Sequence, residues 1–234
     1  MRLFCLPHAG GGATAFRSWT AELPAFVQLC SVLLPGRETR LSEPLYTEIG
    51  PLVDAMDREL RPWLDIPYAV FGHSMGALLA FEWVRKLQRE GCPTPACLFL
   101  SGRRAPDRSG DTSFLHALPN GEFVKELTRV YNGIPQELLD NEELMDVFLP
   151  ILRADIAVVE SYRFQPGDPL VCPITVFSGM NDPSVSWDEL LAWNRQARQR
   201  QFAMQVFPGG HFYPQGPLLQ AISATLNELR SPRG

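Results

Sequence analysis

The most informative part of the chain reads Tyr68-Ala69-Val70-Phe71-Gly72-His73-Ser74-Met75-Gly76. Its first four residues form an apolar run typical of a buried strand, and apolar residues recur at helical spacing from Met75 onward. The G-x-S-x-G pattern from Gly72 to Gly76 therefore lies on a predicted strand-to-helix turn. On such a sharp turn a serine projects from the sheet, and the flanking glycines allow a backbone approach that a β-carbon would block. We therefore interpret Ser74 as an exposed nucleophile rather than as a turn or capping serine.

Outward from this turn, short apolar runs alternate with longer stretches of helical spacing. The short runs predict strands at residues 2–6, 27–34, 67–71, 96–101, 173–178 and 202–207. The longer stretches predict helices at residues 48–63, 75–90, 187–199 and 215–230. Repeated strand-helix units predict an α/β fold class, with a mostly parallel central sheet, flanking helices on both faces and a ligand site at the carboxyl ends of the strands.

One region breaks the alternation, because residues 105–165 hold helical patterns and no convincing strand. The patterns run over 122–131 after Asn120 and over 142–162 after Asn141, and Pro150 is expected to kink the second helix. We predict one domain, residues 1–234, with a core of about 1–104 and 166–234 and a helical lid inserted at about 105–165. The alternative is a helical layer that only packs on the core.

Composition narrows the class of protein and of partner. The 234 residues are 45% hydrophobic and 20% charged, which fits one globular domain with a sizeable core. The five scattered cysteines lack metal-ligand spacing and suggest reduced thiols. No run of 18 apolar residues and no signal-peptide core occur, so we expect no membrane span and a cytoplasmic location. A net charge of -5 argues against nucleic acid as the main partner.

A general base for Ser74 should come late in the chain, because proteins with a nucleophilic serine on such a strand-to-helix turn carry their catalytic residues in the order serine, acid, histidine. Of the four histidines, His8 and His73 precede Ser74 and His116 lies inside the predicted lid. His211 follows the last predicted strand and two glycines that would let its loop turn back over the nucleophile. His211 is thus the predicted base, and a solvated loop histidine is the alternative.

The orienting acid should lie on a loop at the carboxyl end of a strand. Asp182 follows the predicted strand 173–178 and fits this requirement. Asp188 and Glu189 are rivals, but they fall in the first turn of the next predicted helix, where the helix dipole favours acids in any case. We therefore predict that Asp182 orients the imidazole.

Two backbone N–H groups should stabilise an oxyanion. The first is that of Met75, directly after the nucleophile, and the second is expected from the glycine-rich loop after the first strand, where Ala9 is the predicted donor. This loop matches neither the P-loop nor the dinucleotide-binding pattern, so nucleotide binding is disfavoured.

Blocks spread over nearly the whole chain resemble those of the type II thioesterases of polyketide and nonribosomal peptide biosynthesis, which are α/β-hydrolases. The resemblance implies an editing enzyme that hydrolyses acyl groups from the phosphopantetheine arm of acyl or peptidyl carrier proteins. It also supports Ser74, Asp182 and His211 as the catalytic residues, with Ala9 and Met75 as backbone donors. The blocks are Leu6–Gly11, Leu34–Glu38, Phe71–Ala77, Ser101–Arg103, Leu152–Asp155 and Gly209–Phe212.

A thioester suits this machinery, because a thiolate leaves with little acid assistance. In the second lid pattern, apolar residues form a broad band, and we expect Val147, Phe148 and Ile151 to bind the acyl group rather than serve only as core. No residue cluster calls for a metal or cofactor, and we expect a monomer. The open alternatives are a product-releasing thioesterase, a general carboxylesterase and, from another class, a carrier-binding module with a degenerate triad.

Overall fold

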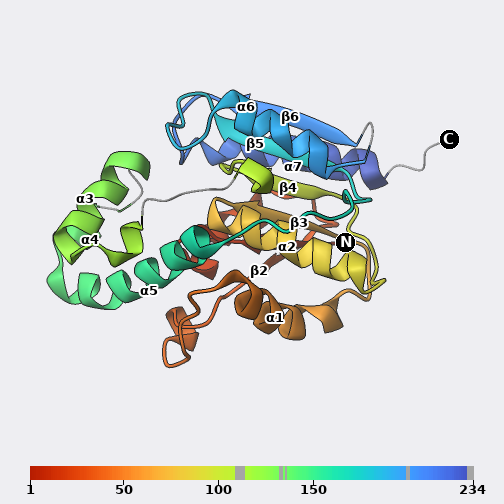
Figure 1. Ribbon diagram of the computed structural model, residues 1–234. Coiled ribbons are helices and arrows are strands. Elements are labelled where there is room, and N and C mark those ends of the chain that lie inside the picture. The colour runs from red at the N-terminus through yellow and green to blue at the C-terminus, as the bar shows by residue number, and fades with distance from the viewer. Residues whose placement is uncertain (109–113, 132–133, 135, 199–200, 231–234) are drawn as a thin grey trace.

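A parallel six-stranded sheet forms the centre of the molecule (Figure 1). The structure is a computed structural model that describes residues 1–108, 114–131, 134, 136–198 and 201–230. The strand order is β2-β1-β3-β4-β5-β6, and every neighbouring pair is parallel. The fold class predicted from the alternating pattern is therefore confirmed. The strands are β1 (Arg2–Leu6), β2 (Gln28–Ser31), β3 (Tyr68–His73), β4 (Leu98–Ser101), β5 (Ile174–Gly179) and β6 (Phe202–Phe207).

Helices cover both faces of the sheet. On one face lie α1 (Ile49–Leu60), α2 (Met75–Arg89) and α6 (Trp187–Leu191), and on the other lies α7 (Gln215–Arg230). The predicted helix 187–199 is shorter than expected, because a 3₁₀ helix (Ala192–Gln196) follows α6; Gln199 lies outside the described residues. Further 3₁₀ helices span Ala13–Ala21, Glu38–Arg40, Arg61–Trp63, Pro106–Arg108 and Leu115–Ala117.

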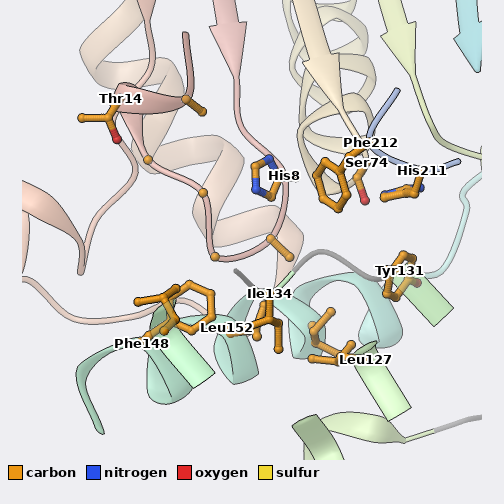
Figure 2. A pocket seen from close by; sticks show the side chains of 17 residues that line it. His8, Thr14, Ser74, Leu127, Tyr131, Ile134, Phe148, Leu152, His211 and Phe212 are labelled. Carbon is orange, nitrogen blue, oxygen red and sulfur yellow. The ribbon is translucent and has the colours of Figure 1, made fainter. Parts of the chain in front are cut away.

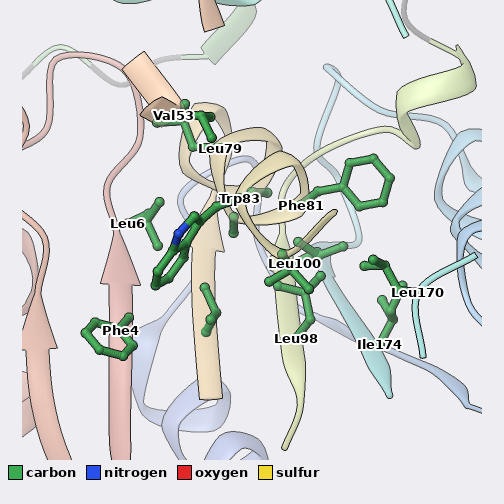
Figure 3. Packing of buried hydrophobic residues seen from close by; sticks show 14 of the residues in the cluster. Phe4, Leu6, Val53, Leu79, Phe81, Trp83, Leu98, Leu100, Leu170 and Ile174 are labelled. Carbon is green, nitrogen blue, oxygen red and sulfur yellow. The ribbon is translucent and has the colours of Figure 1, made fainter. Parts of the chain in front are cut away.

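Strand residues alternate between two hydrophobic clusters, one on each face. Phe4 and Leu6 of β1 pack toward α2 in the first cluster, whereas Leu3 and Cys5 pack toward α7 in the second. Figure 3 shows the first cluster, where the Trp83 side chain of α2 lies above β1 and β3. Because both faces are covered, β1, β3, β4 and β5 read as nearly continuous apolar runs.

The predicted strand 27–34 is wrong at its end, since β2 stops at Ser31. The Val32 N–H still donates to the Cys5 carbonyl at 2.9 Å, but the following residues leave the sheet. Val32 and Leu34 are nevertheless buried in the first cluster. Their apolar character therefore reflects burial as irregular chain, which hydrophobicity alone does not distinguish from a strand.

Between β4 and β5 the described residues form three α-helices besides two short 3₁₀ helices, and those of 105–165 contain no strand. The α-helices are α3 (Asn120–Tyr131), α4 (Gln136–Leu139) and α5 (Glu142–Ser161). In Figure 1, α3 and α4 lie beyond one edge of the core, and α5 runs from them back to α2. Asn141 caps α5 as expected, with its Oδ1 accepting the Leu144 N–H at 3.1 Å, whereas Asn120 is the first residue of α3 rather than its cap. No helix of the described residues is long and apolar enough to cross a membrane.

Candidate active site

Ser74 stands on a strained turn between β3 and α2. Its φ of 56° and ψ of -114° are rare for a residue with a side chain, and such strain is typical of functional turns. A β-carbon at Gly72 would lie 2.1 Å from the Gly76 carbonyl oxygen, and one at Gly76 would lie 2.2 Å from the Leu6 carbonyl oxygen. Both glycines of the G-x-S-x-G pattern are thus required by close backbone packing.

His211 and Asp182 meet at the carboxyl ends of β5 and β6. The His211 Nδ1 and the Asp182 Oδ2 are 2.8 Å apart, and both side chains are buried. Burial alone would raise the pKa of Asp182, but hydrogen bonds from His211 and Ser184 outweigh it and hold that pKa below its ordinary value. The loops that carry the two residues pack backbone to backbone, since a β-carbon at Gly179 would lie 2.0 Å from the Gly210 carbonyl oxygen. Asp182 is thus a charged acceptor fixed against the ring.

Ser184 is a third polar group at this pair, and the sequence reasoning missed it. Its Oγ donates to the Asp182 Oδ1 at 2.6 Å and lies 3.1 Å from the His211 Nδ1, while its N–H donates to the same Oδ1 at 2.9 Å. Side-chain acceptance from the residue two positions later is a common Asp-turn pattern, so the Asp182-Pro183-Ser184 sequence carried a signal.

The rival acids lie elsewhere. Glu189 accepts from the N–H and Oγ of Ser186 and completes a capping box at the start of α6, and Asp188 is exposed in the same helical turn. Within the described residues, neither has a hydrogen bond to His211. Their occurrence is explained by helix capping and the helix dipole.

Ala9 belongs to a tight turn beside Ser74. The Gly11 N–H donates to the His8 carbonyl at 2.9 Å, and Gly10 has a φ of 75°, a geometry that favours glycine at the third position of a type II turn. Among the described residues, the N–H groups of Ala9 and Met75 have no hydrogen-bond partner. Both N–H groups are therefore free to receive a developing negative charge.

A cavity of about 320 Å³ opens beside Ser74 (Figure 2). Figure 2 shows Ser74, His211, Phe212 and His8 along one side, and apolar residues of the α3–α5 region along the other. The wall is mainly apolar, which suits an acyl group. Its residues are His8–Gly12, Thr14, Ala15, Ser74, Leu127, Tyr131, Ile134, Leu138, Phe148, Leu152, Ile156, His211 and Phe212.

Of the three predicted acyl-binding residues, Phe148 lines this cavity and Val147 and Ile151 do not. Val147 is 48% exposed, and Ile151 is buried. The reason is helical geometry: Phe148, Leu152 and Ile156 recur every four residues and share one face of α5, whereas Val147 and Ile151 precede them by about 100° of rotation. The sequence pattern predicted the helix correctly but not which of its sides faces the cavity.

Two further histidines, His8 and His73, lie beside the site, and their lowered pKa values favour the neutral form. Burial, together with the nearby His211 and Arg37, lowers the pKa of His8 to about 4. Burial also lowers the pKa of His73 well below its ordinary value, with smaller effects of His211 and His8. The His73 Nδ1 lies 2.7 Å from the Ser101 Oγ, so this ring packs beneath the Ser74 turn as a hydrogen-bonded support.

No group of three or more His, Cys, Asp or Glu side chains in the described ranges is arranged to hold a metal ion.

Comparison with known proteins adds to this geometry. The family model of the thioesterase domain matches residues 1–227. The gramicidin S biosynthesis protein GrsT of Aneurinibacillus migulanus is 40% identical over 98% of this chain and 89% of its own length. RedJ, a thioesterase from the prodiginine pathway of Streptomyces coelicolor, has a TM-score of 0.89 at 38% identity, over 96% of this chain and 85% of its own.

The type II thioesterase BorB of the borrelidin biosynthetic cluster has a TM-score of 0.86 at 37% identity, over 97% of this chain and 91% of its own. The family match covers nearly the whole chain, and these relatives agree with it in sequence and in fold. The chain therefore belongs to the thioesterase family of α/β-hydrolase fold, and within it to the type II thioesterases, hydrolases that act on thioesters.

Proposed function

We propose that the chain removes acyl groups from phosphopantetheine thioesters of carrier proteins through a serine acyl-enzyme. Ser74 is the nucleophile, His211 the general base and acid, and Asp182 the orienting carboxylate. The observation that carries this proposal is the buried hydrogen bond between His211 Nδ1 and Asp182 Oδ2 beside a serine on a strained turn. GrsT is named as a gramicidin S biosynthesis protein and BorB as a type II thioesterase of the borrelidin biosynthetic cluster, which supports a carrier-bound thioester as substrate.

Acylation begins when the Ser74 oxygen attacks the thioester carbonyl carbon. With its Nδ1 proton directed at Asp182, His211 presents the lone pair of Nε2 to the serine hydroxyl and takes its proton. The carbonyl oxygen becomes an anion that the N–H groups of Ala9 and Met75 stabilise. Collapse of the intermediate breaks the carbon-sulfur bond, and the thiolate leaves and takes up the proton from His211.

Deacylation repeats the sequence with water as nucleophile. His211 Nε2 takes a proton from the water, whose oxygen forms a bond to the acyl carbon. The second tetrahedral intermediate expels the Ser74 oxygen, which recovers its proton from His211. A free carboxylic acid and a free carrier thiol result, which is the outcome an editing role requires.

The region of α3–α5 serves in this proposal as a lid that supplies the apolar wall of the acyl pocket. Leu127 of α3 and Phe148 and Leu152 of α5 support this role, because they line the cavity on the side opposite Ser74 in Figure 2. Ile156 of α5 also lines the cavity. A layer that only packed on the core would have no need to leave such a cavity. The cytoplasmic location and the monomeric state stay predictions.

The decisive test is intact-mass spectrometry of an acylated carrier protein incubated with the wild-type chain and with Ser74→Ala. We expect the wild type to release the acyl group and the folded variant to be at least about 10⁴-fold slower. The same acyl group on coenzyme A and as a simple oxygen ester serves as the comparison. Faster turnover of the oxygen ester than of the carrier thioester would favour the carboxylesterase alternative, and release of a cyclic product would favour the product-releasing one. Binding of the carrier without turnover would indicate the degenerate carrier-binding module.

A further inference from the structure

A buried ion pair joins the loop after β2 to helix α5. The two terminal guanidinium nitrogens of Arg37 donate to the two carboxylate oxygens of Asp155, with Nη1 to Oδ2 at 2.7 Å and Nη2 to Oδ1 at 2.8 Å. The side chains are only 6% and 2% exposed. Burying two charges costs desolvation energy that an ion pair alone often fails to recover, so such a pair is weak evidence of a stabilising role. Its remaining hydrogen bonds indicate what else it does.

The same two side chains hold the glycine-rich turn that carries Ala9. The Asp155 Oδ2 accepts the Gly10 N–H at 2.7 Å, and the Arg37 Nη1 donates to the Gly11 carbonyl at 3.0 Å. Charge-assisted bonds of this kind are the strong ones. The Gly10 N–H belongs to the peptide that directly follows Ala9, so these bonds hold the turn on that side of Ala9. The Ala9 N–H belongs to the preceding peptide, whose His8 carbonyl is tied into the same turn by the Gly11 N–H.

Helix α5 also touches this turn through apolar side chains. A β-carbon at Gly10 would lie 2.8 Å from the Phe148 ring and 3.2 Å from the Leu152 Cδ1, so both side chains press directly on the glycine. Phe148, Leu152 and Asp155 recur at helical spacing and reach the turn from one side of α5. The helix that forms the wall of the acyl pocket is therefore also in contact with the oxyanion turn.

We propose that Asp155, neutralised and oriented by Arg37, is a positioning residue that fixes the Ala9 N–H for the oxyanion from helix α5. The inference rests on the proposed role of Ala9 as an oxyanion donor. Arg37 has two tasks: it holds both carboxylate oxygens in place, and it cancels a negative charge that would otherwise oppose the developing oxyanion. Because α5 both lines the cavity and contacts the turn, an acyl group bound against α5 lies beside an Ala9 N–H that is already oriented for the oxyanion.

The test compares Asp155→Asn with Glu160→Gln in the full chain. Both replace a buried carboxylate of α5 with its neutral isostere, but Glu160 accepts the N–H groups of Leu115 and His116, which lie outside the cavity wall. We expect kcat on an acyl carrier thioester to fall about 10- to 100-fold in Asp155→Asn with little change in KM, because only transition-state stabilisation is weakened. Glu160→Gln should keep the kcat of the wild type, even where its melting temperature falls as much as that of Asp155→Asn.

A second readout is the rate of Ser74 labelling by a fluorophosphonate, whose phosphoryl oxygen gains negative charge during the attack and would be held by the same donors. This rate should fall in Asp155→Asn in proportion to kcat, and the acid limb of the pH-rate profile should stay where it is, because His211 and Asp182 are untouched. If Asp155→Asn does not fold, the double variant Arg37→Met with Asp155→Leu replaces the pair by apolar groups and should fold with the same loss of kcat. An unchanged kcat in a folded variant, or equal losses in Asp155→Asn and Glu160→Gln, would overturn the inference.

Failure of this inference can be told apart from failure of the proposed function. If the wild-type chain does not hydrolyse the thioester, or Ser74→Ala still does, the proposed function is wrong. If the wild type is active and labelled at Ser74 while Asp155→Asn behaves like the wild type, only the positioning role is wrong.

Discussion

At the scale of single residues, the proposed catalytic groups differ sharply in how far sequence identifies them. Ser74 and His211 lie next to glycines that close backbone packing requires, and such a steric requirement is visible in the sequence as a fixed glycine spacing. Asp182 could be separated from Asp188 and Glu189 only by its place on a loop. Ser184 lies two residues after Asp182 and donates a hydrogen bond to its carboxylate. In the sequence it does not differ from an ordinary turn serine, so it is easily overlooked.

Asp182→Asn should reduce kcat by about 10⁴-fold while the chain stays folded. The amide can donate to the His211 Nδ1 and so favours the tautomer that is wrong for accepting the serine proton. Asp188→Asn is the matched control, because this residue is exposed in the first turn of α6. Steady-state hydrolysis and thermal melting of both variants check the prediction, and similar activities in the two would argue against the assigned role of Asp182.

Ser184→Ala should lower kcat by less, on the order of 10-fold. The Asp182 carboxylate loses one hydrogen bond but keeps those of His211 Nδ1 and of the Ser184 N–H. The loss in free energy of unfolding should be about 1 kcal/mol, the usual contribution of one hydrogen bond. Kinetics and chemical unfolding measure the two effects separately, and an unaltered kcat would reduce Ser184 to a turn residue.

At the scale of elements, sequence predicted where helices occur better than which way they face. Periodicity predicted α2, α5 and α7 within a few residues, because long amphipathic stretches repeat the signal several times. The band on α5 is apolar on more than one side, since the helix packs on the core, on its neighbours and along the cavity. Only the tertiary arrangement decides that Phe148 rather than Val147 lines the cavity beside Ser74.

Phe148→Ala should enlarge the cavity and raise kcat/KM for longer acyl groups relative to short ones. Val147→Ala is the neighbouring control, because Val147 is 48% exposed and absent from the cavity wall. Hydrolysis of a series of acyl chains on one carrier protein, at matched thermal stability, provides the measurement. A uniform loss across the series, or the same shift in both variants, would contradict the assigned wall. Since Phe148 also contacts Gly10, we expect a modest drop in kcat for every substrate beside the shift in preference.

At the scale of the whole molecule, half-buried histidines with lowered pKa values couple stability to pH. The pKa of His8 is lowered from 6.5 to about 4, so below pH 6.5 the unfolded chain binds a proton that the folded chain does not. The free energy of unfolding should therefore decrease as pH falls from about 6.5 to about 4, by up to about 3 kcal/mol from this residue. Denaturant unfolding at several pH values measures the slope, and His8→Gln should flatten it. An equal slope in that variant would assign the effect to other groups.

The strand order has a consequence for how the enzyme is made. After β3, each new strand joins the same edge of the sheet, first β4, then β5, then β6. Asp182 and His211 follow the last two of these strands, whereas Ser74 follows β3. Because a domain generally folds as a unit, the serine turn and its two partners are expected to reach their places together, once all six strands are available. A chain in which only β1 to β4 have formed therefore lacks the proposed base and acid, and the three proposed catalytic residues come together only when β5 and β6 have joined the sheet.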